Sequence, residues 1–277
     1  MTNGARAHIE KDVVFGRGGD IDLRLDVYHP AGPSKRTAVI HLHGGGFARG
    51  AKGNNELNCL AFAARGYTSI TSQYRLAAQG RWPDQIHDTK AAIRWTRANA
   101  ERLGVDADKI VVAGYSAGGT LALVAAGSAG VAVLEGDGGN AGVSSEVAAC
   151  IAYYASAQRR RRDPDTGDAL FDAGEPDEGY RQASGITYAS TAVPTILFHS
   201  VADDTVPVEA SLQLFEAYRA AGVPVEMHIM DGLPHVFERR HTEFLEPTVE
   251  MCDLFLDRLI VNPRVYPPFQ QTAATPG

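Results

Sequence analysis

Apolar and polar side chains alternate strictly over residues 21–28, which is the period of a strand with one buried face. A shorter apolar stretch at residues 13–15 precedes it across the glycines of 16–19, so we expect the two segments to pair. After a turn at residues 30–35, the continuous apolar run of 38–42 predicts a buried strand that breaks at three consecutive glycines. The main sheet is expected to begin at this strand.

Strand and helix patterns then alternate along most of the chain. Helical periodicity indicates helices at residues 57–65, 85–102, 117–126 and 208–221, with a last helix that ends near Leu259. Short apolar runs indicate strands at residues 68–72, 110–113, 147–154, 195–199 and 225–230. Such alternation is typical of a mostly parallel sheet with helices on both faces, so the pattern predicts an α/β fold.

Three segments depart from this pattern. Residues 130–145 are polar and rich in glycine, and residues 263–277 form a tail with four prolines. Residues 159–190 contain Asp-Pro-Asp and Gly-Glu-Pro sequences and few apolar residues in register, so we expect a small lid insertion that shapes substrate access. The chain length of 277 fits one large domain, which we place at residues 1–262.

The composition narrows the class of partner. The formal net charge of −7 provides no basic field for nucleic acid or an anionic membrane surface, so a small molecule is the expected partner. Cys59, Cys150 and Cys252 lie too far apart for a disulfide scaffold or a zinc site and are expected to be small core residues. The N-terminus has no apolar run that resembles a secretion signal, and no later segment is apolar enough to span a bilayer, so we expect a cytoplasmic protein.

A serine between two glycines follows the predicted strand 110–113, in the sequence Gly114-Tyr115-Ser116-Ala117-Gly118, and a helix pattern begins directly after it. A serine at such a sharp strand-to-helix turn has its side chain exposed above the sheet, and the flanking glycines remove Cβ atoms that would crowd the turn. The alternative is a glycine-rich helix start that Ser116 merely caps. The flanking strand and helix favour a nucleophile.

A second motif, His43-Gly44-Gly45-Gly46-Phe47, follows the strand 38–42. Successive glycines leave backbone N–H groups bare, and such donors stabilise the negative oxygen that develops during addition to a carbonyl. In this chemistry a further donor comes from the residue after the nucleophile, here Ala117. His41 and His43 also have the spacing of a metal pair, but no compact set of further ligands follows, so no metal is expected.

A serine hydroxyl needs a histidine base, and the histidine needs a carboxylate that fixes its tautomer. His235 lies in a loop directly after the final predicted strand, which is where the base of this fold is expected, whereas His228 lies inside that strand. Asp203 and Asp204 both follow the strand 195–199, and adjacent side chains rarely point alike. Residue patterns alone do not separate these two aspartates.

These motifs resemble those of the hormone-sensitive-lipase-like and feruloyl-esterase-like carboxylesterases of the α/β-hydrolase superfamily. The resemblance rests on residues 43–47, 73–76, 114–119 and 199–207. It implies the α/β-hydrolase fold, with Ser116 as nucleophile, His235 as base, Asp203 as the acid, and the N–H groups of Gly45, Gly46 and Ala117 as oxyanion donors. Ser200, Gln73 and Ala78 depart from the usual glycine, aspartate and proline, and the strand pattern that begins by residue 13 leaves no length for an N-terminal helical cap.

Several side chains near these motifs are candidates for substrate contact. Phe47 and Tyr115 adjoin the glycine loop and the nucleophile, so either could line an acyl pocket, whereas Trp82 is expected to fill space. The run of four arginines at 159–162 is followed closely by aspartates and is expected to be a solvated loop. Asp88 is expected to serve the start of its helix.

The sequence therefore predicts a serine hydrolase that cleaves carboxylic esters through an acyl-enzyme on Ser116, without a cofactor or a metal. An amidase, an arylformamidase or a peptidase would use the same triad, and a binding protein could keep the fold without turnover. The sequence does not indicate the acyl length, the leaving group or the oligomeric state.

Overall fold

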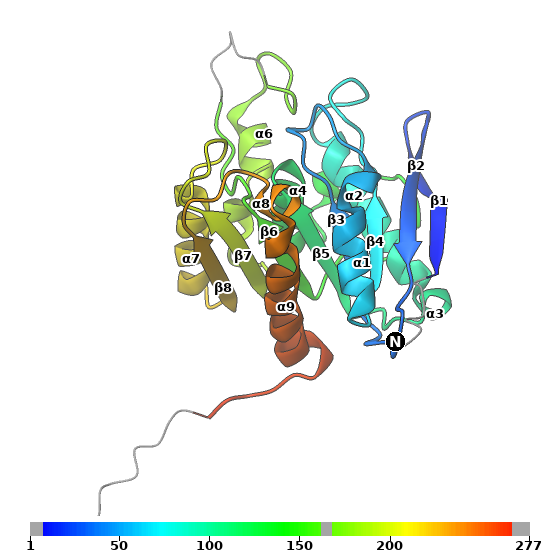
Figure 1. The fold of residues 1–277 in the computed structure, drawn as a ribbon. Coiled ribbons are helices and arrows are strands. Elements are labelled where there is room, and N and C mark those ends of the chain that lie inside the picture. The colour runs from blue at the N-terminus through cyan, green and yellow to red at the C-terminus, as the bar shows by residue number, and fades with distance from the viewer. Residues whose placement is uncertain (1–7, 162–167, 268–277) are drawn as a thin grey trace, which may run out of the picture.

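The computed structural model describes residues 8–161 and 168–267, and these residues form one eight-stranded sheet with the strand order β1-β2-β4-β3-β5-β6-β7-β8 (Figure 1). Strand β1 pairs with β2 and β2 pairs with β4, both in antiparallel fashion, and all later pairings are parallel. The strands are β1 (Ile9–Gly18), β2 (Ile21–Tyr28), β3 (Ala38–Leu42), β4 (Thr68–Ser72), β5 (Ile110–Tyr115), β6 (Ala149–Tyr153), β7 (Thr195–Ser200) and β8 (Val225–Met230).

Helices cover both faces of this sheet. Helices α1 and α9 lie together on one face, and α2, α4 and α7 pack on the other (Figure 1). The longer helices are α1 (Glu56–Ala64), α2 (Asp84–Ala98), α4 (Ala117–Gly127), α7 (Glu209–Ala220) and α9 (Leu245–Leu256). The shorter turns are η1 (Lys52–Asn55), α3 (Ala100–Leu103), α5 (Ala132–Glu135), α6 (Asp177–Gln182), η3 (Gly185–Tyr188), α8 (Phe237–Arg240), η4 (Thr242–Phe244) and the π-helical η5 (Asp257–Val261).

The strand sequences explain this two-sided packing. Successive side chains of a strand point to opposite faces, so a strand covered on both sides needs apolar residues throughout. In β5, Val112 packs in the core under α2 and α4, while Val111 and Ala113 pack in the core under α1 and α9. The predicted α/β-hydrolase fold, with a mostly parallel sheet between two helical layers, is confirmed.

Some predicted boundaries were wrong. Strand β1 is longer than the expected 13–15 and includes Gly16 and Gly18, which we had placed in the turn. A Cβ atom on Gly16 would lie 2.2 Å from the carbonyl oxygen of Gly138, and one on Gly18 would lie 2.4 Å from Nε of Arg75. These glycines therefore mark close approach to neighbouring segments rather than a chain reversal. The expected helix 85–102 is divided into α2 and α3 at Asn99.

The segment 159–190, which we expected to be a small lid insertion, places several of its described side chains in the core and leaves others exposed. It follows β6 and carries α6 and η3, and its side chains of Leu170, Phe171 and Tyr180 are buried in the same cluster as α4. Three members of the arginine and aspartate run, Arg162, Asp163 and Asp165, lie outside the described residues. The described part of the segment is thus anchored beside the carboxyl ends of the strands.

The remaining expectations concern the termini and the cysteines. All three cysteines are buried and free, as predicted. Residues 263–267 extend away from α9 with Val265 95% exposed, and the rest of the predicted tail lies outside the described residues. Within the described part of the chain, no helix combines the length and apolarity that crossing a membrane requires. The cytoplasmic location stays a prediction.

Candidate active site

Ser116 stands at the turn between β5 and α4, above the carboxyl ends of the parallel strands. Its backbone has φ 55° and ψ −116°, a strained conformation for a residue with a side chain. A Cβ atom on Gly114 would lie 2.1 Å from the carbonyl oxygen of Gly118, and one on Gly118 would lie 2.1 Å from that of Leu42. Both flanking glycines are therefore required sterically, and the turn presents the hydroxyl of Ser116 away from the core.

The structure brings Ser116, His235 and Asp203 into one chain of hydrogen bonds. The Oγ atom of Ser116 lies 2.9 Å from Nε2 of His235, and Nδ1 of His235 lies 2.7 Å from Oδ2 of Asp203. Because a carboxylate only accepts, Nδ1 donates to Asp203, which leaves Nε2 free to accept the proton of Ser116. This is the tautomer that a general base beside a serine requires.

Asp203, and not Asp204, is the aspartate that meets the histidine. Its Oδ1 atom accepts the backbone N–H groups of Thr205 and Val206, at 2.9 Å each, and its Oδ2 atom also lies 3.4 Å from Nε2 of His199. Burial alone would raise the pKa of Asp203, but these hydrogen bonds and the one from His235 hold it well below its usual range. Asp204 is exposed, and within the described part of the chain its carboxylate accepts only the hydroxyl of Thr205.

Ser200 joins the loop that carries the acid to the loop that carries the base. Its Oγ atom accepts the N–H of Ala202 and the N–H of Leu233, at 3.2 Å each. We had noted Ser200 only as a departure from the glycine of related esterases. The structure gives the hydroxyl a specific contact, because Leu233 lies two residues before His235.

A tyrosine and a glutamate that the sequence reasoning missed support the other side of His235. The ring of Tyr154 meets the imidazole edge to face, with centroids 4.7 Å apart, and its hydroxyl donates to both carboxylate oxygens of Glu238 at 2.7 and 2.8 Å. Glu238 is 1% exposed, and this burial raises its pKa to about 7. Glu238 lies three residues after His235, but nothing in the sequence indicates its partner Tyr154, which directly follows β6.

Three backbone N–H groups point to an anion site beside Ser116. Within residues 8–161 and 168–267, the amides of Gly45, Gly46 and Ala117 have no hydrogen-bond acceptor. Ala117 opens α4, where the helix dipole favours negative charge. Gly45 has φ +128°, and a Cβ atom there would lie 2.0 Å from the carbonyl oxygen of Arg49, so the loop can take this shape only with glycine.

The segment after β4 holds the glycine loop in place. The ring of Tyr74 stacks on His43 with centroids 4.4 Å apart and donates its hydroxyl to the carbonyl of His43 at 2.7 Å. Arg75, the next residue, is fixed by Asp88, whose carboxylate accepts the guanidinium at 2.8 Å and the Arg75 backbone N–H at 2.8 Å. Our expectation for Asp88 was wrong, because this 1% exposed carboxylate anchors the loop support rather than the start of α2.

Two hollows meet at Ser116. The larger has a volume of about 960 Å³ and is bordered by the glycine loop, Tyr154, His235 and α8. The smaller, of about 120 Å³, is bordered by Phe47 and Ala117 and by residues 156, 159 and 168–169. Ser116 borders both, so a substrate that reaches it can place one part in each.

The side chains considered for substrate contact have different surroundings in the structure. Phe47 borders the smaller hollow. Tyr115 borders the larger one, but its side chain is 2% exposed and its hydroxyl is bound by Asn58 at 2.7 Å, so we assign it a packing role. The prediction of a solvated loop was wrong for Arg159, whose guanidinium lies over the Phe47 ring, 5.5 Å from its centroid, and pairs with Asp168 at 2.7 Å.

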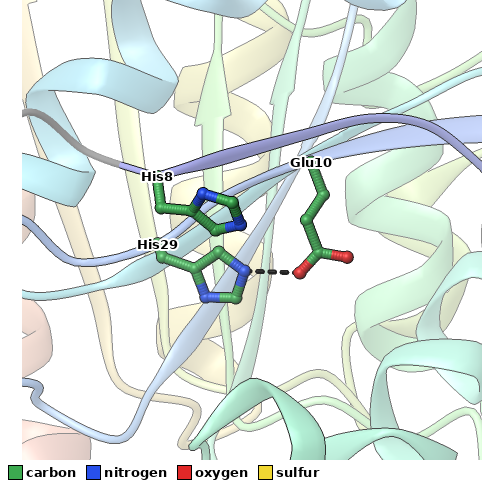
Figure 2. A group of neighbouring side chains, drawn as sticks. All are labelled: His8, Glu10 and His29. Carbon is green, nitrogen blue, oxygen red and sulfur yellow. Dashed lines mark hydrogen bonds and ion pairs between the residues drawn. The ribbon is translucent and has the colours of Figure 1, made fainter.

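One group of three potential metal ligands occurs among the described residues, at the far edge of the sheet. His8, Glu10 and His29 lie within 4.8 Å of one another, and Figure 2 shows both imidazoles beside the carboxylate. The guanidinium of Arg102 already contacts both carboxylate oxygens of Glu10, at 2.9 and 3.1 Å, which opposes a cation there. The other candidate ligand, His41, is fully buried and bonded to Ser69 and Tyr115.

Comparison with known proteins places these features in a family context. The model of the BD-FAE family matches residues 25–218, which include the glycine loop, Ser116 and the acid loop. Esterase LipC of Mycobacterium tuberculosis is 30% identical over 257 residues, covering 87% of this chain and 64% of LipC. The arylesterase of Saccharolobus solfataricus is 36% identical over 103 residues, which is 34% of that protein. The chain thus spans less than two thirds of the length of these relatives.

Solved structures match over nearly the whole chain. Esterase 2 of Thermogutta terrifontis with bound propionate superposes with a TM-score of 0.79 at 30% identity, covering 95% of this chain and 97% of that one. The same esterase phosphorylated by paraoxon gives a TM-score of 0.78 at 28% identity, covering 95% and 98% of the two chains.

Proposed function

Because the chain belongs to the BD-FAE family and has the α/β-hydrolase fold, we propose that it is a serine esterase that hydrolyses carboxylic esters of small molecules. The observation that carries the proposal is the continuous chain of hydrogen bonds from Ser116 through His235 to Asp203, beside amides that have no acceptor among the described residues. A nucleophile, a base and an anion site then meet at one point, as acyl transfer requires.

In the first half of the reaction, His235 takes the proton of Ser116 as the serine oxygen bonds to the ester carbonyl carbon. The carbonyl oxygen becomes negative and is held by the N–H groups of Gly45, Gly46 and Ala117. When the carbon–oxygen bond to the alcohol breaks, His235 returns the proton to the departing oxygen. Ser116 is left carrying the acyl group.

In the second half, water replaces the alcohol. His235 takes a proton from the water as its oxygen attacks the acyl carbon, and then returns a proton to Ser116 as the carboxylic acid leaves. Asp203 stays ionised throughout, because its hydrogen bonds hold its pKa well below its usual range, and its charge stabilises the imidazolium. No cofactor takes part in this scheme.

The size of the smaller hollow limits the acyl group. A volume of about 120 Å³ beside Ala117 accommodates a short chain, and Phe47 and Arg159, whose side chains lie against each other, both border it. We therefore assign short aliphatic acyl groups to this chain. The propionate and butyrate complexes of the Thermogutta terrifontis esterase support an acyl group of this length.

Replacement of the nucleophile tests the proposal. Ser116→Ala should lower kcat for 4-nitrophenyl acetate by about five or six orders of magnitude, because a triad without its nucleophile loses the covalent route. Ser128→Ala is the matched control, since Ser128 caps the opposite end of α4. Near-normal turnover by a folded Ser116→Ala protein would refute the mechanism.

A further inference from the structure

The two hollows can be assigned to the two halves of an ester. The oxygen of the leaving alcohol must lie within hydrogen-bond distance of Nε2 of His235, because that atom protonates it. His235 borders the larger hollow and not the smaller one. The alcohol half of the substrate therefore lies in the larger hollow, and the acyl half lies in the smaller one.

Three arginines border the hollow that receives the alcohol. Arg49 belongs to the loop after β3, and Arg239 and Arg240 belong to α8, so the positive charges come from two separate segments (Figure 1). All three side chains are exposed. Each segment also carries a proposed reacting group, the oxyanion loop in one and His235 in the other, which fixes the arginines close to the reaction.

Among the residues that the structure describes, the side chains of these three arginines form no hydrogen bond and no ion pair. Among the described residues, every other arginine except Arg36 has a side-chain hydrogen bond or an ion pair. The chain as a whole carries a net charge of −7, so acidic side chains are in excess. Three guanidinium groups at one hollow, without an ion-pair partner in the described part of the chain, therefore provide a positive region on a chain whose net charge is negative.

The acidic groups near the hollow do not cancel this charge. Asp204 is the carboxylate on its lining, and the hydroxyl of Thr205 donates to it. Glu238 belongs to α8 itself, where it is 1% exposed and accepts the hydroxyl of Tyr154, and burial raises its pKa to about 7, so it keeps its proton below that pH. Arginine recognises carboxylates and phosphates in particular, because its planar group donates two parallel hydrogen bonds to them.

We propose that the natural ester has a leaving group with a negative charge, and that Arg49, Arg239 and Arg240 bind this charge while the short acyl group occupies the hollow beside Phe47. This inference rests on the proposed esterase function. The sequence does not indicate these three arginines, because its most visible basic feature is the run at 159–162. In the structure, Arg159 of that run pairs with Asp168 beside the smaller hollow.

A pair of matched esters tests the inference. In 4-acetoxybenzoate the leaving phenol carries a carboxylate, and in 4-acetoxybenzamide it carries a neutral amide. The quantity to measure is the ratio of kcat/KM for the anionic ester to kcat/KM for the neutral one, in the wild type and in the triple variant Arg49→Gln, Arg239→Gln, Arg240→Gln. Arg36→Gln is the control, because Arg36 is equally exposed and unpaired but precedes β3 at the opposite end of the sheet.

The ratio should fall by about 2- to 5-fold for each single glutamine, as expected for a partly solvated ion pair, and by about tenfold or more in the triple variant. High salt should lower the ratio of the wild type and leave that of the triple variant unchanged. Arg36→Gln should keep the ratio of the wild type. A triple variant with the ratio of the wild type would overturn the inference while the esterase function stands.

Binding of the two product phenols, measured by calorimetry, separates this inference from the proposed function. If neither ester is cleaved, the esterase function fails. The inference is then supported if 4-hydroxybenzoate binds more tightly than 4-hydroxybenzamide and loses that preference in the triple variant. It is refuted if the wild type binds both phenols equally.

Discussion

Replacing Asp203 with asparagine should invert the protonation of the proposed base. Oδ1 of Asp203 accepts the backbone N–H groups of Thr205 and Val206, so the carbonyl oxygen of an asparagine must take that position. Its NH₂ group then replaces Oδ2, which lies 2.7 Å from Nδ1 of His235. Because NH₂ only donates, Nδ1 must accept, and the ring proton moves to Nε2, where it faces Ser116.

This change removes the acceptor that the serine needs. In a related triad the wrong tautomer lowers kcat by about four orders of magnitude, which corresponds to about 5 kcal/mol in the barrier. Asp203→Asn should therefore reduce kcat for 4-nitrophenyl acetate by about 10⁴-fold with little change in KM. The shape of the site is kept, so the far-ultraviolet circular dichroism spectrum should not change.

Asp204→Asn is the matched comparison, because the two carboxylates are adjacent in sequence and only one meets His235. We expect it to lower kcat by less than about tenfold, since the carboxylate of the exposed Asp204 accepts one hydrogen bond from the described residues, from the hydroxyl of Thr205. The assignment of the acid would be refuted if kcat fell by less than about 100-fold in Asp203→Asn, or if it fell more in Asp204→Asn than in Asp203→Asn.

Two further predictions concern the oxyanion loop and the group beneath the base. Gly45→Ala should lower kcat by about 10²- to 10³-fold, because a Cβ atom there would lie 2.0 Å from the carbonyl oxygen of Arg49 and would displace a donor. Gly46→Ala, where the Cβ atom meets nothing within 4 Å, should lower kcat by less than about tenfold. If steady-state assays show that the two alanine variants lose kcat equally, the role assigned to Gly45 is wrong. The pKa of Glu238 is about 7 in the folded protein, whereas it has its ordinary value of 4.5 in the unfolded chain. Between these pH values the folded state binds more protons than the unfolded state. The free energy of unfolding therefore falls as the pH rises from about 4.5 to about 7. In urea unfolding, the free energy of unfolding of Glu238→Gln should therefore rise by about 3 kcal/mol relative to that of the wild type between about pH 4.5 and about pH 7. If the two free energies change in parallel with pH over this range, the raised pKa is refuted.

Local sequence was sufficient to predict those parts of the site whose geometry depends on neighbouring residues. A buried strand, a serine between glycines and a helix start define the turn at Ser116, because Gly114 and Gly118 must lack Cβ atoms for the chain to fold there. The strand that ends in three glycines likewise indicated the loop in which the amides of Gly45 and Gly46 have no acceptor among the described residues. Both features lie within about ten residues, so the sequence pattern carries them.

Features that depend on distant partners were not predictable in this way. An aspartate near a helix start can interact with the helix dipole or bind an arginine, and the residues that pack against it decide which. Asp88 binds Arg75, which is 13 residues away in the sequence. Tyr154 and Glu238 are 84 residues apart in the chain, and no periodicity relates them. The choice between Asp203 and Asp204 needed the family resemblance, since their order in sequence does not fix which one faces His235.

The most direct test of the account is covalent labelling with paraoxon, which phosphorylates the Thermogutta terrifontis esterase. Intact-protein mass spectrometry and peptide mapping should find one diethylphosphoryl group on Ser116, with loss of ester hydrolysis in proportion to labelling and no label on Ser116→Ala. A fully labelled protein that still hydrolyses 4-nitrophenyl acetate, or a label on another residue that accompanies the loss of activity, would contradict the proposal that Ser116 is the nucleophile.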